Sequence, residues 1–114
     1  MDVENFVDEL FRSLTDTGLF EGVSLQAEGP VVSGYAYVRG NKQCFLRFYY
    51  NEVTGTLAFA LIKQQHRVWG IDFDNRRQWH VHPLESPEKH RPIDPLSVAD
   101  VIKRLQDVLL DLCA

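Results

Sequence analysis

The chain has 114 residues, of which 45% are hydrophobic and 25% are charged, and its net charge is −4. This length allows one domain, residues 1–114, with a single core, and the negative charge excludes a protein that coats nucleic acid over its whole surface. The longest uncharged apolar run, residues 53–62, is about half as long as a membrane-spanning helix. The acidic N-terminus lacks the features of a signal peptide.

The two cysteines, Cys44 and Cys113, stand apart from each other and lack the spacing of metal ligands. Isolated cysteines of this kind are typical of reduced thiols in a cytosolic protein. We therefore expect a cytoplasmic protein that has no membrane association and needs no cofactor.

The N-terminal segment carries apolar residues at helical spacing, namely Val3, Phe6, Val7, Leu10, Phe11 and Leu14. This pattern predicts an amphipathic helix over residues 3–17, with Asp2 as its N-cap and Gly18 just beyond its C-terminal end. From residue 22 the apolar pattern changes to a period of two, which indicates β-strands. Strands are expected at about residues 22–28, 31–38, 43–51, 56–64, 67–73 and 78–83.

Short turns join these strands, so consecutive strands must be antiparallel neighbours. Prolines interrupt residues 86–95, and we expect a loop without regular structure there. Residues 97–112 return to helical spacing, and Ser97 with Asp100 resembles a capping box. The order predicts an α+β fold in which a curved antiparallel sheet of about six strands, a meander, carries the N- and C-terminal helices on one face.

The third and fourth expected strands are apolar on both faces, although two helices can cover only one face of a sheet. The other face, with Phe45 or Tyr49, must curl on itself, hold a ligand or meet a partner. We expect a homodimer or a complex with another protein through this face, and strong curvature of the sheet is the alternative.

The last expected hairpin gathers polar residues on one face. Trp69, Ile71 and Phe73 alternate with Gly70 and Asp72 in one strand, and Trp79 and Val81 alternate with His80 and His82 in the next. A three-residue loop at residues 75–77 pairs the apolar residues with each other, and the same register places Asp72 beside His80 and Gly70 beside His82. The glycine leaves open space beside His82. We expect the helices on the face that carries the apolar residues.

The segment from Lys63 to Arg91 contains all four histidines, and its six basic residues exceed its four acidic residues by two. Cleavage of RNA through the ribose 2′-OH needs a base, an acid for the leaving 5′ oxygen and a cation for the phosphorane. Histidine can supply the first two near neutral pH, and arginine the third. The candidate catalytic residues are His80, His82, His90 and Asp72, and the candidate RNA-binding residues are Arg76, Arg77 and Arg91.

Within this scheme Asp72 favours the protonated ring of His80, so that His80 is the acid and His82 the base. Two histidines at i and i+2 on a strand, with Asp72 or His90, also form a partial metal site. His-x-His alone is a weak signal, and no metal is expected. A solvated sheet face whose histidines only form hydrogen bonds is a further alternative.

A family resemblance rests on Phe73-Asp74-Asn75, on Trp79-His80-Val81-His82-Pro83 and on the segment from Pro87 to Pro95. In these elements the second half of the chain resembles the TumE-type toxins of prokaryotic toxin–antitoxin systems. The resemblance implies a growth-inhibiting protein that acts on RNA, as an mRNA interferase-like ribonuclease does, and that is held by a cognate antitoxin protein. A non-catalytic protein-binding or homodimeric module with the same fold is the alternative function.

Overall fold

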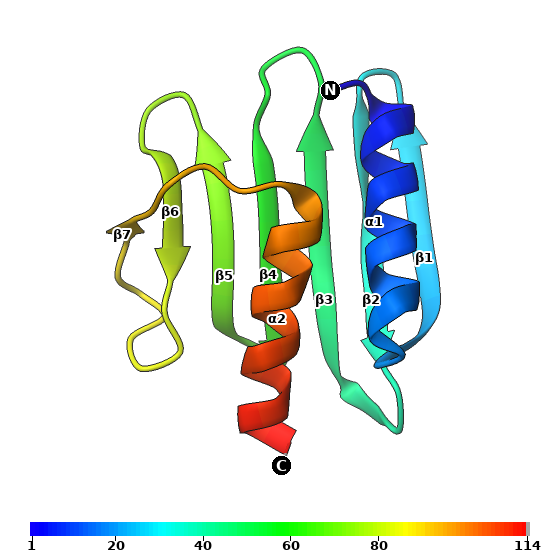
Figure 1. Ribbon diagram of the computed structural model, residues 1–114, viewed down its shortest axis with the longest axis vertical. Helices are drawn as coiled ribbons and strands as arrows, with labels where there is room; N and C mark the ends of the chain where they lie inside the picture. Colours follow the sequence, from blue (N-terminus) through cyan, green and yellow to red (C-terminus); the bar gives the residue numbers. More distant parts are fainter. Residues whose placement is uncertain (114) are drawn as a thin grey trace.

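The computed structural model describes residues 1–113 and contains two helices and seven strands. In chain order they are α1 (Val3–Thr17), β1 (Phe20–Glu28), β2 (Val31–Val38), β3 (Asn41–Asn51), β4 (Leu57–Lys63), β5 (His66–Asp74), β6 (Gln78–His82), β7 (Arg91–Pro92) and α2 (Val98–Cys113). The strands form one open sheet in sequence order, and each pairs antiparallel with the next (Figure 1). The predicted α+β meander is confirmed.

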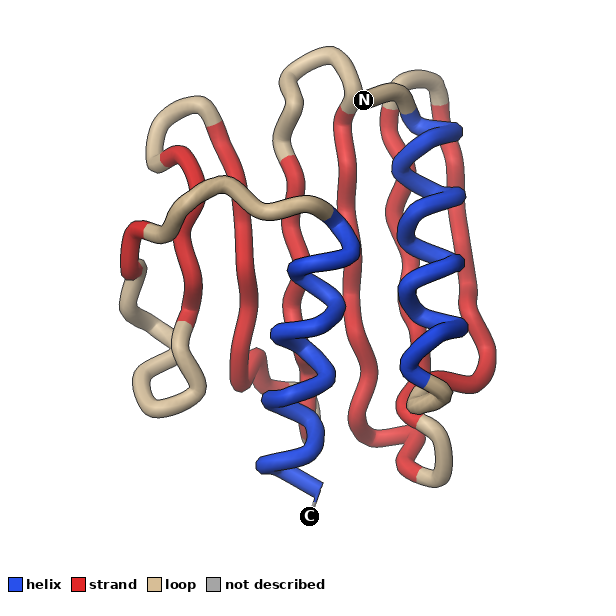
Figure 2. Tube along the Cα trace, in the orientation of Figure 1, coloured by secondary structure: helices blue, strands red, loops and turns tan. Residues whose placement is uncertain are grey.

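Strand β7 is the element that the sequence analysis missed. Residues 86–95 were expected to lack regular structure, but Arg91 and Pro92 pair with Val81 and His80 of β6 (Figure 2). The backbone N–H of Ile93 then donates to the carbonyl of Trp79 at 3.1 Å. Proline is tolerated here because β7 is an edge strand, where a missing N–H breaks no ladder on the far side.

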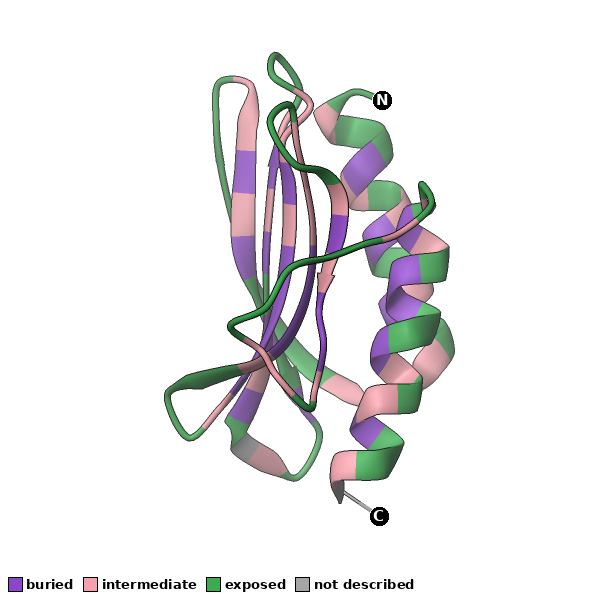
Figure 3. Ribbon diagram, turned by 90° about the vertical axis from the view of Figure 1, so that its left-hand side faces the viewer, coloured by how far each residue is buried: buried purple, intermediate pink, exposed green. Residues whose placement is uncertain are grey.

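Both helices lie on one side of the sheet, α1 over β1 and β2 and α2 over β3 and β4 (Figures 1 and 3). We call this side the helix face. Trp69 and Ile71 are buried there, and Phe73, Trp79 and Val81 pack against the same core while remaining partly exposed. The expectation that the helices cover these residues is confirmed, and their exposure rises toward β6 because α2 ends its cover before that strand.

The helix ends follow the predicted signals. Asp2 accepts the backbone N–H of Asn5 at 2.7 Å, and Gly18 ends α1 in the left-handed conformation with φ of +67°. Ser97 accepts the backbone N–H of Asp100 at 3.1 Å and so caps α2. None of the helices among residues 1–113 is long and apolar enough to cross a membrane. Cys44 is buried in the core, whereas the side chain of Cys113 lies outside the described residues.

The backbone of β1 lies unusually close to Gly34 of β2, which pairs with Leu25. A Cβ atom on Gly34 would lie 2.0 Å from the carbonyl oxygen of Ser24 and 2.8 Å from the ring of Phe48. Neither backbone nor a buried ring can move away cheaply, so this position accepts only glycine.

We therefore predict that Gly34→Ala lowers the free energy of unfolding by about 2–3 kcal/mol, the usual cost of overpacking a core. Urea denaturation followed by circular dichroism measures the change. Ser33→Ala, one residue earlier in β2, is the matched control and should change stability by less than about 0.5 kcal/mol. Equal stability of the two variants would contradict the close approach.

Candidate functional site

The hairpin of β5 and β6 has the register that the sequence predicts. Asp72 pairs with His80, Gly70 with His82 and Ile71 with Val81, across a loop formed by residues 75–77. The carboxylate of Asp74 holds this loop, because its Oδ1 accepts the backbone N–H groups of Arg76 at 2.9 Å and Arg77 at 2.6 Å. The hairpin therefore presents a polar row on the side of the sheet opposite the helices, which we call the open face.

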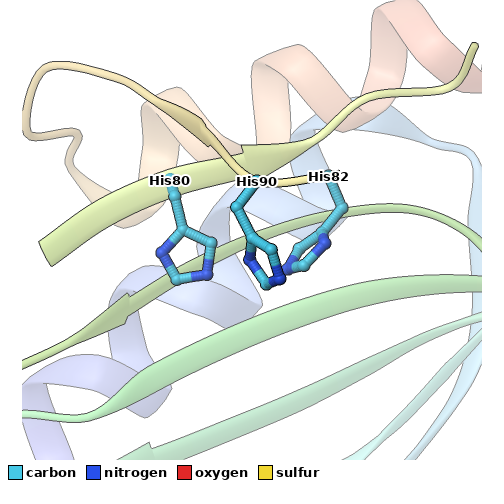
Figure 4. A group of neighbouring side chains, drawn as sticks. All are labelled: His80, His82 and His90. Atoms are coloured by element: carbon cyan, nitrogen blue, oxygen red, sulfur yellow. The ribbon is translucent and has the colours of Figure 1, made fainter. Parts of the chain in front are cut away.

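Strand β7 completes a cluster of three histidines on this face. Its pairing with β6 brings His90 over the hairpin, where the ring centroid of His90 lies 4.5 Å from that of His82 and 5.2 Å from that of His80. Figure 4 shows the three rings gathered on the same side of β6, and the centroids of His80 and His82 lie 5.2 Å apart. One ring nitrogen from each residue lies within 4.8 Å of the others. We call His80, His82 and His90 the histidine cluster.

The cluster is less exposed than a solvated sheet face would be. His80 and His82 are each only 2% exposed, whereas His90 is exposed. The expected open space beside His82 is also wrong. A Cβ on Gly70 would lie 2.8 Å from the carbonyl oxygen of Phe59, so this glycine accommodates the neighbouring strand.

Asp72 interacts with both buried histidines, not with His80 alone as the sequence analysis assumed. Its Oδ2 lies 3.0 Å from Nε2 of His82 and 3.5 Å from Nε2 of His80. On the other side of each ring, Nδ1 of His80 lies 3.0 Å from the carbonyl oxygen of Gln78, and Nδ1 of His82 lies 3.0 Å from that of Pro87. Because a carbonyl oxygen can only accept, both Nδ1 atoms carry protons and donate them. The expectation that Asp72 has His80 as its only histidine partner is therefore wrong.

His90 has a different environment. A guanidinium nitrogen of Arg77 lies 3.3 Å from its Nδ1 and 3.2 Å from its Nε2. Partial loss of solvent, together with the positive charge of Arg77, lowers the pKa of His90 below its usual value. A lowered pKa favours the neutral form of the ring, which offers a lone pair.

The open face is hollowed next to the cluster. A hollow of about 340 Å³ is lined by residues that include Tyr35, Arg47, Tyr49, Arg67 and Asp72. The hollow is deep at its centre because the residues that line it there are small, namely Gly34, Ala58 and Ala60. Strand pairing forms one continuous row across five strands, in the order Tyr35, Arg47, Ala60, Gly70 and His82. We call this the central row, and its two small members separate Arg47 from His82.

Aromatic rings extend the open face at the other end. Tyr35 and Tyr37 are 41% and 37% exposed, and both contact the ring of Phe45, with centroid distances of 5.4 and 5.8 Å. The helices do not cover this side, as the doubly apolar pattern of β3 and β4 indicated (Figure 3). Exposed rings beside Arg47 form a surface on which a flat ligand can stack.

The structure brings together five of the seven predicted site residues: Asp72, Arg77, His80, His82 and His90. Arg76 stays exposed at the hairpin tip. Arg91 pairs with Val81, so strand alternation turns it to the helix side, and its guanidinium instead binds Glu85 at 3.1 Å. Sequence reasoning missed Arg47 and Arg67, although a lone charge inside the apolar strand at Arg47 was a usable signal.

Comparisons with protein-family models, with curated proteins and with solved structures found no match to this chain. The chemistry of the site must therefore be inferred from its own geometry.

The carboxylate of Asp74 gives a test of the hairpin that positions Arg77. Its hydrogen bond from the backbone N–H of Arg77, then that of Arg76, lowers its pKa. A lowered pKa stabilises the fold above the unfolded-state value of about 3.9, and this contribution is lost as the pH falls through the folded pKa. We predict that Asp74→Asn lowers Tm by a few degrees at pH 7 and by much less at pH 3.

Thermal unfolding at the two pH values measures this difference. Asp8→Asn, which removes an exposed carboxylate from α1, is the control for a change of net charge alone. The same loss of Tm at pH 3 and pH 7 in Asp74→Asn would contradict the role of the ionised carboxylate.

Proposed function

We propose that this protein is a small cytoplasmic RNA-acting enzyme, a ribonuclease of toxin type, which binds single-stranded RNA on the open face and cleaves it at the histidine cluster. The observation that supports this most is the central row, which joins an exposed tyrosine and an arginine to a buried histidine. Proteins that bind single-stranded nucleic acids combine aromatic stacking surfaces with basic grooves in this way.

The length of the central row suits an extended strand of RNA. Neighbouring β-strands lie about 4.8 Å apart, so Arg47 and His82, three strands apart, are separated by about 14 Å. Bases would stack on Tyr35 and Tyr37, while the guanidinium groups of Arg47 and Arg67 would neutralise phosphates. The net charge of −4 is compatible with this because the contact is confined to one face.

Cleavage would join the ribose 2′-oxygen to phosphorus and break the bond to the 5′ oxygen, leaving a 2′,3′-cyclic phosphate and a 5′-hydroxyl. One proton leaves the 2′-OH and one reaches the 5′ oxygen. His90 is the histidine whose ring a substrate would reach, with Arg77 beside it to balance phosphorane charge. His80 and His82 are too buried to contact the substrate directly. They would therefore act on the substrate only through a group that is bound to their rings.

We predict that Tyr35→Ala and Arg47→Ala each weaken binding of a fluorescently labelled single-stranded RNA about 5- to 100-fold, the usual worth of one stacked base or of a phosphate contact. Fluorescence anisotropy measures the affinity, and Arg47→Ala should also reduce its salt dependence. Arg12→Ala, an exposed arginine on α1 at the opposite face, is the matched control and should bind like the wild type. Equal affinity of Arg47→Ala and Arg12→Ala would refute binding on the open face.

Cleavage itself is tested by His90→Ala, because His90 is exposed and its replacement removes no side chain from the core. The rate of cleavage should fall about 100-fold or more, while RNA affinity changes little. Mass spectrometry of the products should show cyclic phosphates. Wild-type protein that binds RNA but never cleaves it would remove the catalytic part of this proposal.

A second candidate function is a non-catalytic module whose open face meets another copy of the chain or a cognate antitoxin. The exposed rings of Tyr35 and Tyr37 favour it, because large apolar surface is costly to leave in water. A specific homodimer would bury about 1,000 Å² or more. Light scattering should then give twice the monomer mass, and Tyr37→Ser should shift the population toward the monomer. A monomer at high concentration would exclude this assembly.

A further inference from the structure

The donor atoms around Asp72 are spaced as the ligands of one metal ion. Zinc binds nitrogen and oxygen at about 2.0–2.1 Å, so neighbouring ligands of a tetrahedral site lie about 3.4 Å apart. Oδ2 of Asp72 is 3.0 Å from Nε2 of His82 and 3.5 Å from Nε2 of His80. A ring nitrogen of His90 lies within 4.8 Å of a ring nitrogen of each of the other two histidines. To bind the ion, this ring would exchange its contact with the guanidinium of Arg77, 3.2–3.3 Å away, for the metal.

The hydrogen bonds behind the rings also match a metal site. A histidine that binds a metal usually donates its second ring N–H to a carbonyl or a carboxylate, which fixes the tautomer and aims the other nitrogen. The Nδ1 groups of His80 and His82 donate to the carbonyls of Gln78 and Pro87, each at 3.0 Å. Both Nε2 lone pairs are thereby directed toward the carboxylate of Asp72.

Hydrogen bonds alone do not explain well why both Nε2 atoms lie so close to the carboxylate of Asp72. Without a metal, Nε2 of His82 can donate to Asp72 only if its ring carries a second proton, whereas Nε2 of His80, 3.5 Å from the same carboxylate oxygen, faces that oxygen with a lone pair. Two acceptor atoms that face each other are unfavourable in a site of low exposure. A divalent cation removes the conflict, because two neutral imidazoles and one carboxylate can all direct lone pairs at it while the Nδ1 bonds remain.

We propose that Asp72, His80, His82 and His90 form a binding site for one zinc ion. The first three ligands are fixed by the register of β5 and β6, and β7 delivers the fourth. Imidazole and carboxylate ligands favour zinc over the hard ions Mg²⁺ and Ca²⁺. The exposed ligand, His90, marks the side from which water or a phosphate oxygen would reach the ion.

The site is inferred from the donor atoms alone, and only its use in RNA cleavage rests on the proposed function. In RNA cleavage a zinc ion at this place would hold an oxygen of the scissile phosphate, and a hydroxide bound to it would accept the proton of the 2′-OH. His90 would then serve as a ligand of the ion, in place of proton transfer by its own ring. The sequence analysis expected no metal, and the proposed zinc site departs from that expectation.

The test is direct metal binding by the purified full chain. Protein stripped with a chelator should take up one equivalent of Zn²⁺ with micromolar or tighter affinity, measured by competition with a chromophoric chelator, and its Tm should rise by several degrees. Mg²⁺ should do neither. His90→Ala and His82→Gln should each bind zinc more than about 100-fold more weakly, since loss of an outer-shell partner alone costs 10–100-fold. His66→Ala, an exposed histidine of β5 outside the cluster, is the matched control.

Wild-type affinity in His66→Ala with the loss confined to the cluster variants would support the site. No zinc uptake by the wild type, or equal affinity in His90→Ala and His66→Ala, would overturn it. Because the ring of His90 is exposed, this comparison stands even where His82→Gln fails to fold. Zinc uptake without RNA cleavage would count against the proposed ribonuclease and leave the site intact. Cleavage that is unchanged in zinc-free protein would overturn the use of the ion in catalysis.

Discussion

The register of the β5–β6 hairpin is the constraint on which both faces of this sheet depend. Pairing of Phe73 with Trp79 gives the helices an apolar surface, and the same pairing gathers Asp72 and His80 on the other side. A slip of β6 by one residue would exchange the two faces of that strand, placing its imidazoles in the core and Trp79 in water. The hydrophobic effect on the helix face therefore sets the geometry of the polar cluster without any direct contact between them.

The open face carries different kinds of residue at its two ends. Large rings and Arg47 occupy one end, and the histidine cluster occupies the other, with Ala60 and Gly70 between them. The small residues have two effects, since they let neighbouring strands approach closely and they leave the hollow. Asp72 connects the two ends, because it lines the hollow and also contacts His80 and His82.

Local signals in the sequence were sufficient for much of this structure. The apolar period predicted both helices, their caps at Asp2 and Ser97 were visible, and a three-residue loop could satisfy only one register of the last hairpin. Features that depend on contacts between distant segments could not be predicted from these signals. Nothing local tells that β7 pairs with β6, so the sequence could offer His90 only as a conditional member of the cluster, and the burial of His80 was unforeseen. The central row likewise depends on the register of five strands together.

The two edges of the sheet have opposite character. Strand β7 is two residues long and contains Pro92, which cannot donate to a further strand. At the other edge, a bulge disturbs the start of β1, but residues 23–28 run on without Lys, Arg or Pro, and Val23 and Leu25 are about 40% exposed. Any backbone that extends this sheet, whether a swapped segment of a second copy or the first layer of an aggregate, would therefore add at β1. Strands added at this edge would extend the sheet on the side away from the histidine cluster.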